Sequence, residues 1–363
     1  MWLPFRPDSL EVLSDPLARK SLNRYFAVME DKLPARFQIC KRISVKIDLS
    51  SDESILLAEH KAAMEKFWKT LSKIDDGKIR LQEMEIPEVS LLELKIELAK
   101  RILRKCHFCE RRCGVDRTIG ERGACGVGEK PKVASEFMHY GEEPELVPSY
   151  TIFFSGCTFK CRFCQNWDIS QFPDEGTEAN PRILARLVEN ARDNGARNVN
   201  WVGGDPTPNL HAILEALWFC KTNIPSVWNS NMYLTTEAMD LLAGTQDIYL
   251  TDFKYGNDKC AERLSLVKNY FAVVSRNHKI AAADSELIIR HLVMPNHLEC
   301  CTYPVLEWIA KNLGHETRVN IMDQYRPEYL APKFEDINRR ITVEEMDKAL
   351  SYARKFGLKN IIT

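Results

Sequence analysis

The stretch Phe153-Phe154-Ser155-Gly156-Cys157-Thr158-Phe159-Lys160-Cys161-Arg162-Phe163-Cys164 places three cysteines in a C-x3-C-x2-C spacing directly after a short apolar run. Three thiolates this close in sequence can bind three corners of one four-iron cluster, which leaves the fourth iron without a protein ligand. An open metal position is where a metal site does chemistry. The spacing alone is equally compatible with a zinc knuckle completed by a distant ligand, or with buried thiols.

The apolar run before the cysteines is the first of a regular series of short β-type runs that alternate with helical segments. The runs are Thr151–Phe154, Asn198–Val202, Ser226–Trp228, Asp247–Phe253, Glu286–Met294 and Thr317–Met322, and the helices lie near 181–193, 208–222, 235–243, 258–280, 299–313 and 342–356. Alternation of this kind predicts an α/β fold with a parallel sheet and helices outside it. Because parallel crossovers are right-handed, the strands can curl into a partial, TIM-like (βα)6 barrel.

Polar motifs follow these predicted strands at their carboxyl ends. They are the cysteine loop, Gly203-Gly204-Asp205, Asn229-Ser230-Asn231, the pair Asp252 and Lys254, and Asp323-Gln324-Tyr325. Arg290 is an exception, because it lies inside the fifth run. Ligands and catalysis are found at the carboxyl face of α/β barrels, so the alignment predicts a site at that face.

The aromatic Phe163 immediately before the last cysteine, and Gly203-Gly204-Asp205 one βα unit later, carry a family resemblance. The sequence resembles the radical S-adenosylmethionine (radical SAM) enzymes, whose signature is C-x3-C-x-aromatic-C followed by a GGE-like motif. Within that superfamily it looks like the pyruvate formate-lyase activating-enzyme-like branch, through the strings Thr151–Cys157 and Cys164–Gln171. The resemblance covers residues 90–363 and is specific for cofactor and chemistry rather than for substrate.

This resemblance implies that Cys157, Cys161 and Cys164 hold a 4Fe-4S cluster whose open iron binds the amino and carboxylate groups of S-adenosylmethionine. One electron from the cluster would break a sulfur–carbon bond and give a 5′-deoxyadenosyl radical, which removes a hydrogen atom from the substrate. The cofactors supply that chemistry, and the protein supplies position and the exclusion of water.

The glycine motif also acquires an implied role. Gly203 and Gly204 would let the backbone approach the methionine moiety, and Asp205, where the family usually has Glu, would accept from its ammonium group. The alternative is a strand-to-helix turn with an N-capping Asp205 and a helix-starting Pro206. Phe163 is expected to pack on the adenine, with simple filling of the loop as the alternative.

Further site residues follow from the same comparison of motifs. Asn229 and Asn231 stand at a DTN-like motif, whose leading Asp helps to bind a cation in the activating enzymes and is Asn229 here. Asp252 and Lys254 match an Asp-x-Lys pair near the cofactor and the substrate peptide, and they are the candidate catalytic residues. The alternative for this pair is an ordinary buried ion pair.

Arg290 matches an arginine that pairs with the cofactor carboxylate, a contact that charge assistance would strengthen; a purely structural role is the alternative. Gln324 stands where the activating enzymes have His. Gln165, Asn166 and Trp167 are expected to shape the mouth of the substrate site.

A second cysteine group, Cys106-x2-Cys109-x3-Cys113-x11-Cys125, lies upstream among glycines that permit tight turns. Four thiolates close a coordination shell, so this site is expected to be structural or an electron relay, and zinc and a second iron–sulfur cluster fit equally. The nearby basic residues are either a solvated face or a docking surface for an acidic electron donor: Arg101, Arg104, Lys105, Arg111, Arg112, Arg117 and Arg122. The other cysteines, Cys40, Cys220, Cys260, Cys300 and Cys301, are expected to be small buried hydrophobic residues.

The length of 363 residues and these patterns divide the chain into a helical N-terminal region (1–89), a helix plus a four-cysteine metal-binding module (90–148) and a radical SAM partial barrel (149–363). Helices are expected to start at Ser14-Asp15-Pro16 and at Ser51-Asp52-Glu53. The apolar stripe predicted for the second is Ile55, Ala58, Ala62, Phe67, Trp68 and Leu71. Ser90 and Glu93 form a predicted capping box for a helix from Leu91 to about Arg104.

The composition, 45% apolar and 28% charged with a net charge of −1, is that of a globular protein without a polycationic signal for nucleic acid or anionic membranes. No apolar run approaches the ~20 residues of a membrane helix. The N-terminal residues Met1–Asp8 have no secretory h-region, so we expect a cytoplasmic protein.

The leading hypothesis is therefore a radical SAM enzyme, similar to glycyl-radical-enzyme activases, that abstracts hydrogen from a protein or peptide substrate. It would need an electron donor such as flavodoxin or ferredoxin. Radical modification of a small molecule is the second hypothesis, and a non-catalytic metal-binding scaffold is the third.

Overall fold

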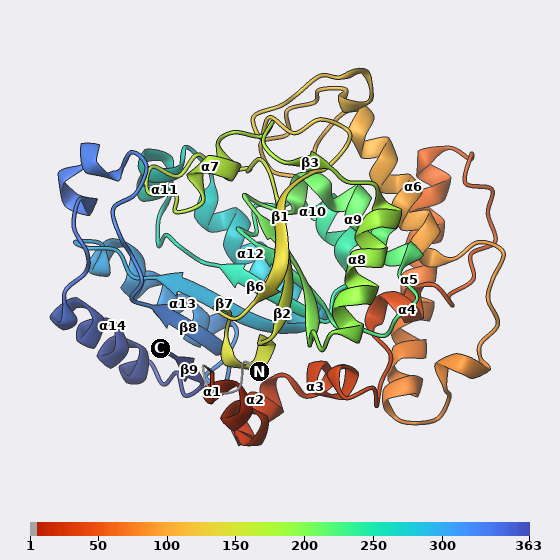
Figure 1. The fold of residues 1–363 in the computed structure, drawn as a ribbon, viewed down its shortest axis with the longest axis horizontal. Helices are drawn as coiled ribbons and strands as arrows, with labels where there is room; N and C mark the ends of the chain where they lie inside the picture. The colour runs from red at the N-terminus through yellow and green to blue at the C-terminus, as the bar shows by residue number, and fades with distance from the viewer. Residues whose placement is uncertain (1–5) are drawn as a thin grey trace.

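The computed structural model describes residues 6–363. Residues 1–5, which belong to the N-terminal segment predicted to have no secretory signal, lie outside the described residues. Its centre is a nine-stranded sheet with the strand order β3-β1-β2-β4-β5-β6-β7-β8-β9 (Figure 1). The central strands β2, β4, β5, β6, β7 and β8 run parallel in chain order. Their bounds are β2 (Ser149–Phe154), β4 (Asn198–Gly203), β5 (Ser226–Ser230), β6 (Ile248–Asp252), β7 (Glu286–Leu292) and β8 (Arg318–Met322). The six predicted strands are confirmed, and the parallel order is consistent with a partial TIM-like barrel.

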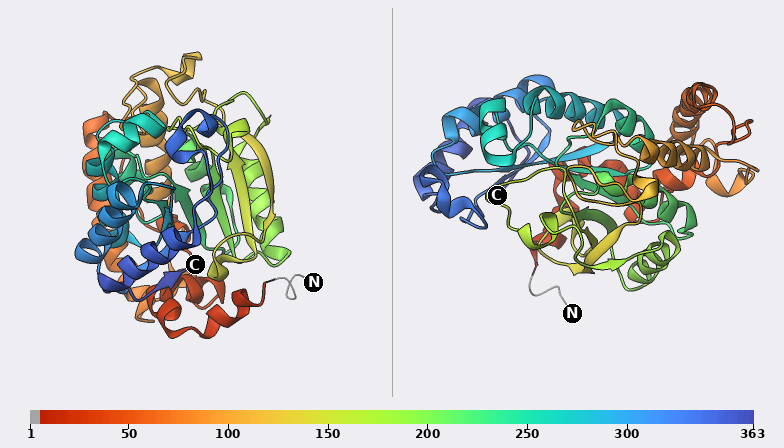
Figure 2. Two further views of the ribbon diagram at one scale, coloured as in Figure 1. Left: turned by 90° about the vertical axis from the view of Figure 1, so that its left-hand side faces the viewer. Right: turned by 90° about the horizontal axis from the view of Figure 1, so that it is seen from above.

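Helices connect these strands and cover the outer face of the sheet, as the two turned views show (Figure 2). They are α8 (Pro181–Asp193), α9 (Leu210–Phe219), α10 (Thr236–Leu242), α11 (Asp258–Ser265), α12 (Tyr270–Asp284), α13 (Tyr303–Asn312) and α14 (Val343–Lys355). The predicted single helix at 258–280 is wrong: Leu266 and Asn269 have φ values of 55° and 51°, which separate α11 from α12. The predicted helix at 299–313 begins as a π-helical turn, η7 (Leu298–Thr302).

Three short or edge strands extend the parallel core beyond the predicted six. β1 (Lys132–His139) pairs antiparallel with β2, β3 (Thr177–Glu178) pairs with β1, and β9 (Ile361–Ile362) pairs with β8. β1 lies within the segment predicted to be the cysteine module. Between β1 and β2 the chain passes through the turn η5 (Pro144–Leu146), and a short helix, α7 (Trp167–Ser170), follows the cysteine loop.

The N-terminal region begins with α1 (Asp8–Glu11), α2 (Pro16–Ser21) and α3 (Asn23–Met29), which lie at the lower edge of the sheet in Figure 1. Asp15 accepts from the backbone N–H groups of Leu17 and Ala18, which confirms the predicted helix start. The buried Leu22, Tyr25 and Phe26 pack against Leu146, Val227, Ile248, Leu250 and Ile288. This cluster closes the barrel at the amino ends of its strands, opposite the predicted site.

The long helix α5 (Glu53–Asp75) follows α4 (Arg36–Cys40) and packs beside α6 (Leu91–Arg104). Its buried face consists of Leu56, His60, Ala63, Phe67, Leu71 and Ile74. The predicted stripe is therefore wrong for Ile55, Ala58 and Ala62, which are exposed. Apolar residues lie on both sides of this helix, so packing rather than composition selects the buried side.

The predicted capping box at the start of α6 is confirmed. The Ser90 hydroxyl accepts from the Glu93 N–H at 3.3 Å, and the Glu93 carboxylate accepts from the Ser90 N–H at 2.8 Å. These two bonds satisfy amide groups that a helix start would otherwise leave without partners. α6 ends at Arg104 and so brings the chain to Cys106.

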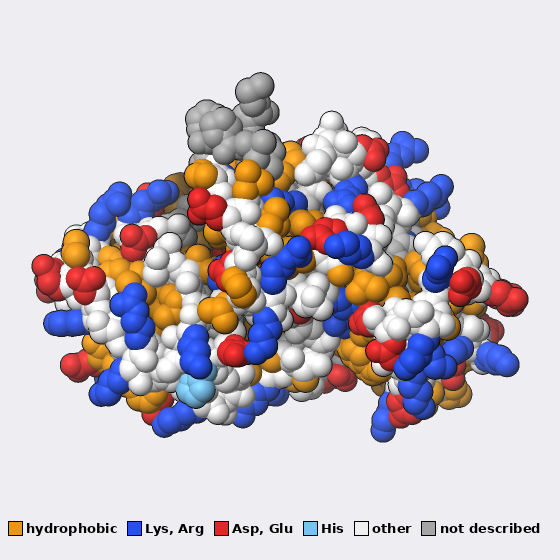
Figure 3. Space-filling view, turned by 90° about the horizontal axis from the view of Figure 1, so that it is seen from below, with side chains coloured by type: hydrophobic (Ala, Val, Ile, Leu, Met, Phe, Trp, Pro, Cys, Tyr) orange, Lys and Arg blue, Asp and Glu red, His pale blue; other side chains and the backbone are white. Residues whose placement is uncertain are grey.

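The surface shows no segregation of charge on the lower face of the molecule. Seen from below, Lys and Arg side chains are interspersed with Asp and Glu side chains (Figure 3). Within residues 6–363, no helix combines the length and the apolar character needed to cross a bilayer.

Candidate functional site

A cavity lies at the carboxyl ends of the six parallel strands. Its lining comprises Cys157, Cys161, Phe163, Cys164, Gln165, Asn166, Val202, Gly203, Gly204, Asn229, Ser230, Asn231, Asp252, Lys254, Arg290, Leu292, Met322 and Gln324. The structure thus brings together at one cavity nearly all the site residues predicted for the barrel. Asp205 and Trp167 do not line it.

The three cysteines of the loop after β2 all face this cavity, and they are the only thiols among its lining residues. Each sulfur has a polar neighbour: Asn231 Nδ2 lies 3.6 Å from Cys157 Sγ, Ser265 Oγ 2.9 Å from Cys161 Sγ, and Ser170 Oγ 3.1 Å from Cys164 Sγ. Three converging thiols with donors aimed at their sulfurs fit an iron–sulfur cluster that keeps one iron free.

Burial raises the pKa of these thiols, and their mutual proximity adds to the effect. The pKa of Cys161 rises to about 12, and that of Cys157 lies well above its usual range. Neutral thiols are therefore the stable form without a metal. A bound cationic centre reverses this preference, because it stabilises the thiolates that coordinate it.

Gly203 and Gly204 are required by backbone packing between the ends of β4 and β2. Gly203 has a φ of 124°, and a Cβ there would lie 2.1 Å from the carbonyl oxygen of Phe154. A Cβ on Gly204 would lie 2.1 Å from the carbonyl oxygen of Gly156. The glycine pair therefore lets the cysteine loop sit directly on the β4 turn, in addition to the predicted approach to a cofactor.

Asp205 is buried behind the cavity wall. One carboxylate oxygen accepts from the Thr207 N–H at 2.9 Å, in the manner of the N-cap alternative. The other accepts from the N–H and Nδ2 of Asn231 at 3.1 and 2.8 Å and from the Ser230 hydroxyl at 3.3 Å. Asp205 thereby fixes the orientation of Asn231. Its contact with a cofactor ammonium group stays a prediction.

Lys254 joins two of the predicted residues on the cavity wall. Its Nζ donates to Asn231 Oδ1 at 2.7 Å and also to the Asp252 carboxylate. Burial opposes the charged form of Lys254, but the neighbouring Asp252 carboxylate outweighs it and raises the pKa of Lys254. The ammonium group is therefore charged at neutral pH and lies beside the cysteines. The Asp252–Lys254 ion pair is present and belongs to the cavity.

Arg290 lies within β7, as predicted, and it pairs with two carboxylates. Its Nε and Nη2 donate to the two oxygens of Glu143 at 2.7 and 2.6 Å, and Nη2 also donates to Glu142. Its Nη1 lies 3.4 Å from Asn229 Oδ1. Burial alone would lower the pKa of Arg290, but these carboxylates raise it well above its usual range. Arg290 therefore already has two protein counter-ions.

The sequence assigns no role to Glu142 and Glu143. They come from the segment between β1 and β2, which contacts side chains of the barrel interior: Asn320 donates to Glu143 at 2.8 Å and Asn200 to Glu142 at 3.1 Å. The signal available is an acidic pair before Pro144 together with an arginine inside a strand. No pattern in the sequence near either the acidic pair or the arginine predicts that they form an ion pair.

Aromatic and amide side chains form the rim of the cavity. The Phe163 ring packs on Tyr325 with centroids 5.8 Å apart, and Gln165 donates to the Gln324 carbonyl at 3.1 Å. Trp167 stacks on Tyr329 at 5.6 Å, just outside the lining.

The upstream cysteine group packs directly against the cysteine loop. A Cβ on Gly156 would lie 2.4 Å from Val127 Cγ2 and 3.0 Å from the Cys125 carbonyl oxygen. The Gly114 N–H donates to the Cys106 carbonyl at 2.9 Å, and the Ala124 N–H, beside Cys125, donates to Cys113 Sγ at 3.4 Å, so turns of this segment bring its cysteines near one another. The predicted four-cysteine set is therefore close to the predicted cluster, while the identity of its metal stays a prediction.

Most of the basic residues around this module are used within the chain. Arg111 donates to the carbonyls of Thr158 and Leu266 at 2.5 and 2.8 Å. Arg117 is 1% exposed and donates to the Pro208 carbonyl at 2.7 Å. These two arginines therefore belong neither to a solvated face nor to a docking surface, because each binds backbone carbonyls of other segments of the chain.

Comparisons with known proteins agree with this site. The sequence profile of the Radical SAM superfamily matches residues 151–309. The chain is 50% identical over 343 residues to the uncharacterized protein MJ0674 of Methanocaldococcus jannaschii, covering 93% of this chain and 98% of that protein.

Solved structures show weaker likenesses. Streptococcus suis SuiB bound to precursor peptide SuiA has a TM-score of 0.41 and 15% identity, over 55% of this chain and 43% of that chain. A domain of pyruvate-formate lyase-activating enzyme from Bacteroides vulgatus has a TM-score of 0.37 and 17% identity, over 46% of this chain and 99% of that chain. Both TM-scores are below 0.5, so these likenesses say nothing about the substrate. The chain therefore carries a Radical SAM superfamily domain at residues 151–309, and by its near full-length relative it belongs to the same family as MJ0674.

Proposed function

We propose that this protein is an iron–sulfur enzyme that cleaves S-adenosylmethionine reductively at Cys157, Cys161 and Cys164 and abstracts hydrogen from a protein or peptide. The observation that carries the proposal is the cavity, where three thiols of one loop meet polar side chains from the carboxyl ends of the other strands. When bound, the cluster and S-adenosylmethionine supply the electron transfer and the radical.

The chain's own residues would hold and tune the cluster. Ser265 and Asn231 direct donors at the sulfurs of Cys161 and Cys157. Hydrogen bonds and positive charge near a cluster stabilise its reduced form. Lys254 supplies that charge, while Asp252 and Asn231 fix its position.

The other wall of the cavity would bind the polar groups of S-adenosylmethionine. Two kinds of group line this wall and could bind them: the side-chain amides of Asn229 and Asn231, and the backbone at Gly203 and Gly204. Arg290 is less available to a cofactor carboxylate than the resemblance implies, because Glu142 and Glu143 already neutralise it. We therefore assign it to the support of Asn229.

A protein or peptide substrate is supported by the aromatic side chains beside the cavity. Trp167 and Phe172 are 37% and 50% exposed, with ring centroids 6.0 Å apart. Aromatic residues are enriched where proteins bind one another. A small-molecule substrate is the second candidate, because polar side chains on the cavity wall, among them Asn229, Asn231 and Lys254, could bind one.

The test is the formation of 5′-deoxyadenosine. Anaerobically reconstituted protein with dithionite and S-adenosylmethionine should release it, and Cys161→Ala should abolish it. The matched control is Cys220→Ala, which removes another buried cysteine remote from the cavity. Release by Cys161→Ala equal to that of the unmutated chain would contradict the assignment, and no release by any form would favour a non-catalytic scaffold.

The substrate class and the electron donor need separate measurements. Supplying flavodoxin or ferredoxin in place of dithionite tests the donor. Exchange of deuterium from a labelled peptide pool or metabolite pool into 5′-deoxyadenosine would show which class supplies the hydrogen. Metal analysis of Cys106→Ala/Cys109→Ala decides between iron–sulfur and zinc at the upstream site.

A further inference from the structure

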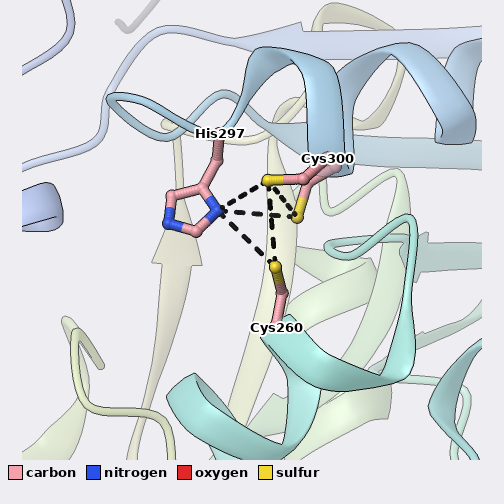
Figure 4. A group of neighbouring side chains, drawn as sticks. Cys260, His297 and Cys300 are labelled. Carbon is pink, nitrogen blue, oxygen red and sulfur yellow. Dashed lines mark hydrogen bonds between the residues drawn. The ribbon is translucent and has the colours of Figure 1, made fainter.

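A third group of metal-ligand side chains, separate from the cavity and from the upstream cysteines, lies between α11 and the connection from β7 to α13. It consists of Cys260, His297, Cys300 and Cys301, whose ligand atoms all lie within 4.8 Å of one another. Cys260 comes from α11, and the other three come from η7 and the residue before it. Cys260, His297 and Cys300 point toward one another from these separate elements (Figure 4).

The spacing of the ligand atoms matches a single tetrahedral ion. A zinc–sulfur distance of about 2.3 Å places tetrahedral sulfurs about 3.8 Å apart. The sulfur of Cys300 lies 3.8 Å from those of Cys260 and Cys301. His297 Nδ1 lies 3.8 Å from the sulfurs of Cys260 and Cys301 and 3.1 Å from that of Cys300.

The surrounding residues orient these ligands as outer partners do in metal sites. The other ring nitrogen of His297, Nε2, lies 3.0 Å from Asp336 Oδ2, which also pairs with Arg263. A carboxylate on the free nitrogen of a metal-binding histidine fixes its ring and tautomer. Asn257 Nδ2 lies 3.4 Å from Cys260 Sγ and donates to the Cys300 carbonyl at 2.7 Å.

The cluster is also protected from solvent and closed by protein ligands. His297, Cys260 and Cys301 are buried, and Cys300 is half-buried. The π-helical turn brings His297, Cys300 and Cys301 to one side of the backbone, and such turns are frequent at functional sites. Simple buried hydrophobic thiols would not require a histidine and a carboxylate arranged around them.

We propose that Cys260, His297, Cys300 and Cys301 bind one structural zinc ion. Three thiolates and an imidazole in a tetrahedral set, with no open position, are the ligands typical of structural zinc. Binding displaces the protons of the three thiols to solvent, and no electron is transferred.

A zinc ion at this position would stabilise the helix that contacts the cysteine loop. The last turn of α11 accepts from that loop: Lys160 N–H donates to the Ser265 carbonyl at 3.0 Å and Arg162 N–H to the Leu264 carbonyl at 2.7 Å. Ser265 Oγ also reaches Cys161 Sγ. A zinc ion that ties α11 to η7 therefore holds the helix on which the cysteine loop rests.

Zinc content tests the proposal in a chain whose upstream site has been disabled by Cys106→Ala/Cys109→Ala. This protein, purified anaerobically, should hold about one zinc per chain. Adding Cys260→Ala/Cys300→Ala should remove it and speed hydrogen exchange in α11. Adding Cys40→Ala/Cys220→Ala, a matched pair of buried cysteines outside the cluster, should not. Absence of zinc from the parent protein, or its retention without Cys260 and Cys300, would overturn the proposal.

X-ray absorption at the zinc edge keeps the test independent of whether the variants fold. In the unmutated chain, the zinc spectrum should contain imidazole scattering from His297 in addition to sulfur. A spectrum of sulfur ligands alone, or no zinc signal, would overturn the assignment. A disulfide between Cys260 and Cys300 would appear as a mass loss of two hydrogens without zinc, and it would also overturn it.

Discussion

Arg290 and Glu143 form a bidentate ion pair inside the barrel, with nitrogen–oxygen distances of 2.7 and 2.6 Å. β7 supplies the arginine, and the segment before β2 supplies the glutamate, 147 residues earlier in the chain. The pair lies directly under the cavity that carries the predicted cluster ligands, because Arg290 also lines that cavity. It connects the barrel interior to the site.

Replacing Glu143 with Gln should lower the free energy of unfolding by about 2–3 kcal/mol, because Arg290 then keeps a single carboxylate partner in a buried position. Chemical denaturation of the metal-free protein measures this. Glu316→Gln is the control, since Glu316 pairs with Lys20 at the exposed surface and its replacement should change the free energy of unfolding much less. Equal losses of unfolding free energy in the two variants would show that the buried ion pair stabilises the fold no more than the surface pair does.

Lys254→Met should slow 5′-deoxyadenosine formation about 10- to 100-fold while the iron content is kept. The change removes the positive charge beside Cys161 and the contact that holds Asn231, and small displacements in a site cost this much. Rates under excess dithionite measure it, and the reduction potential of the cluster should become more negative. Lys95→Met is the control, because it removes another buried lysine that contacts His60 and does not line the cavity. It should leave the rate and the reduction potential unchanged.

Gly204→Ala should displace the cysteine loop, because the added Cβ would lie 2.1 Å from the Gly156 carbonyl oxygen. We expect a loss of about 2–3 kcal/mol in the free energy of unfolding and weaker iron retention. Gly128→Ala serves for comparison, since the nearest atom to its Cβ is Arg122 Nε at 3.9 Å. Normal iron binding by Gly204→Ala would mean that the two backbones separate easily.

The stability of the metal-free protein should fall as the pH rises from about 4.5 to about 7, through Glu286. Burial raises the pKa of this carboxyl from 4.5 to about 7, although the N–H groups of Arg24 and Tyr25 oppose the shift. A folded-state pKa above the unfolded value favours the protonated form on folding, so its contribution is complete below pH 4.5 and is lost as the pH passes 7. Because the Glu286 side chain is partly exposed, we expect the free energy of unfolding to fall by about 2 kcal/mol over this pH range.

Glu286→Gln should flatten this part of the stability profile, because the amide does not titrate. Denaturant midpoints at several pH values provide the measurement. A slope that persists unchanged in the variant would assign the pH dependence to other carboxyls, such as the buried Asp247 or Asp284, whose pKa values burial also raises.

Phe26→Ala should destabilise the whole chain by about 3–5 kcal/mol, since Phe26 is fully buried at the amino ends of the strands. The prediction includes a single unfolding transition followed by fluorescence and circular dichroism, because α3 and the barrel share this cluster. Leu10→Ala, at a residue that is 44% exposed, should change little. A separate early transition in Phe26→Ala would instead support an N-terminal region that folds by itself.

Much of the scaffold could be predicted from the sequence because the signals are local. Each parallel strand is a short apolar run, and Ser90 with Glu93 or Asp15 before Pro16 mark helix starts through bonds within a few residues. The carboxyl-end rule then placed Asn231, Lys254 and the three loop cysteines near one another, and the cavity contains all of them. The turn at Leu266–Asn269, with its positive φ values, has no comparable signal, and the helix there was predicted as one piece.

By itself, the sequence determined the alternation of strands and helices and the close grouping of the three loop cysteines, since both depend on neighbours along the chain. Only the tertiary structure decided which side of α5 is buried, that Glu143 meets Arg290, and that Cys260 meets His297, Cys300 and Cys301. These contacts join residues from separate elements. Their free energy depends on burial and on the distance between groups, which are fixed when the helices and strands pack together.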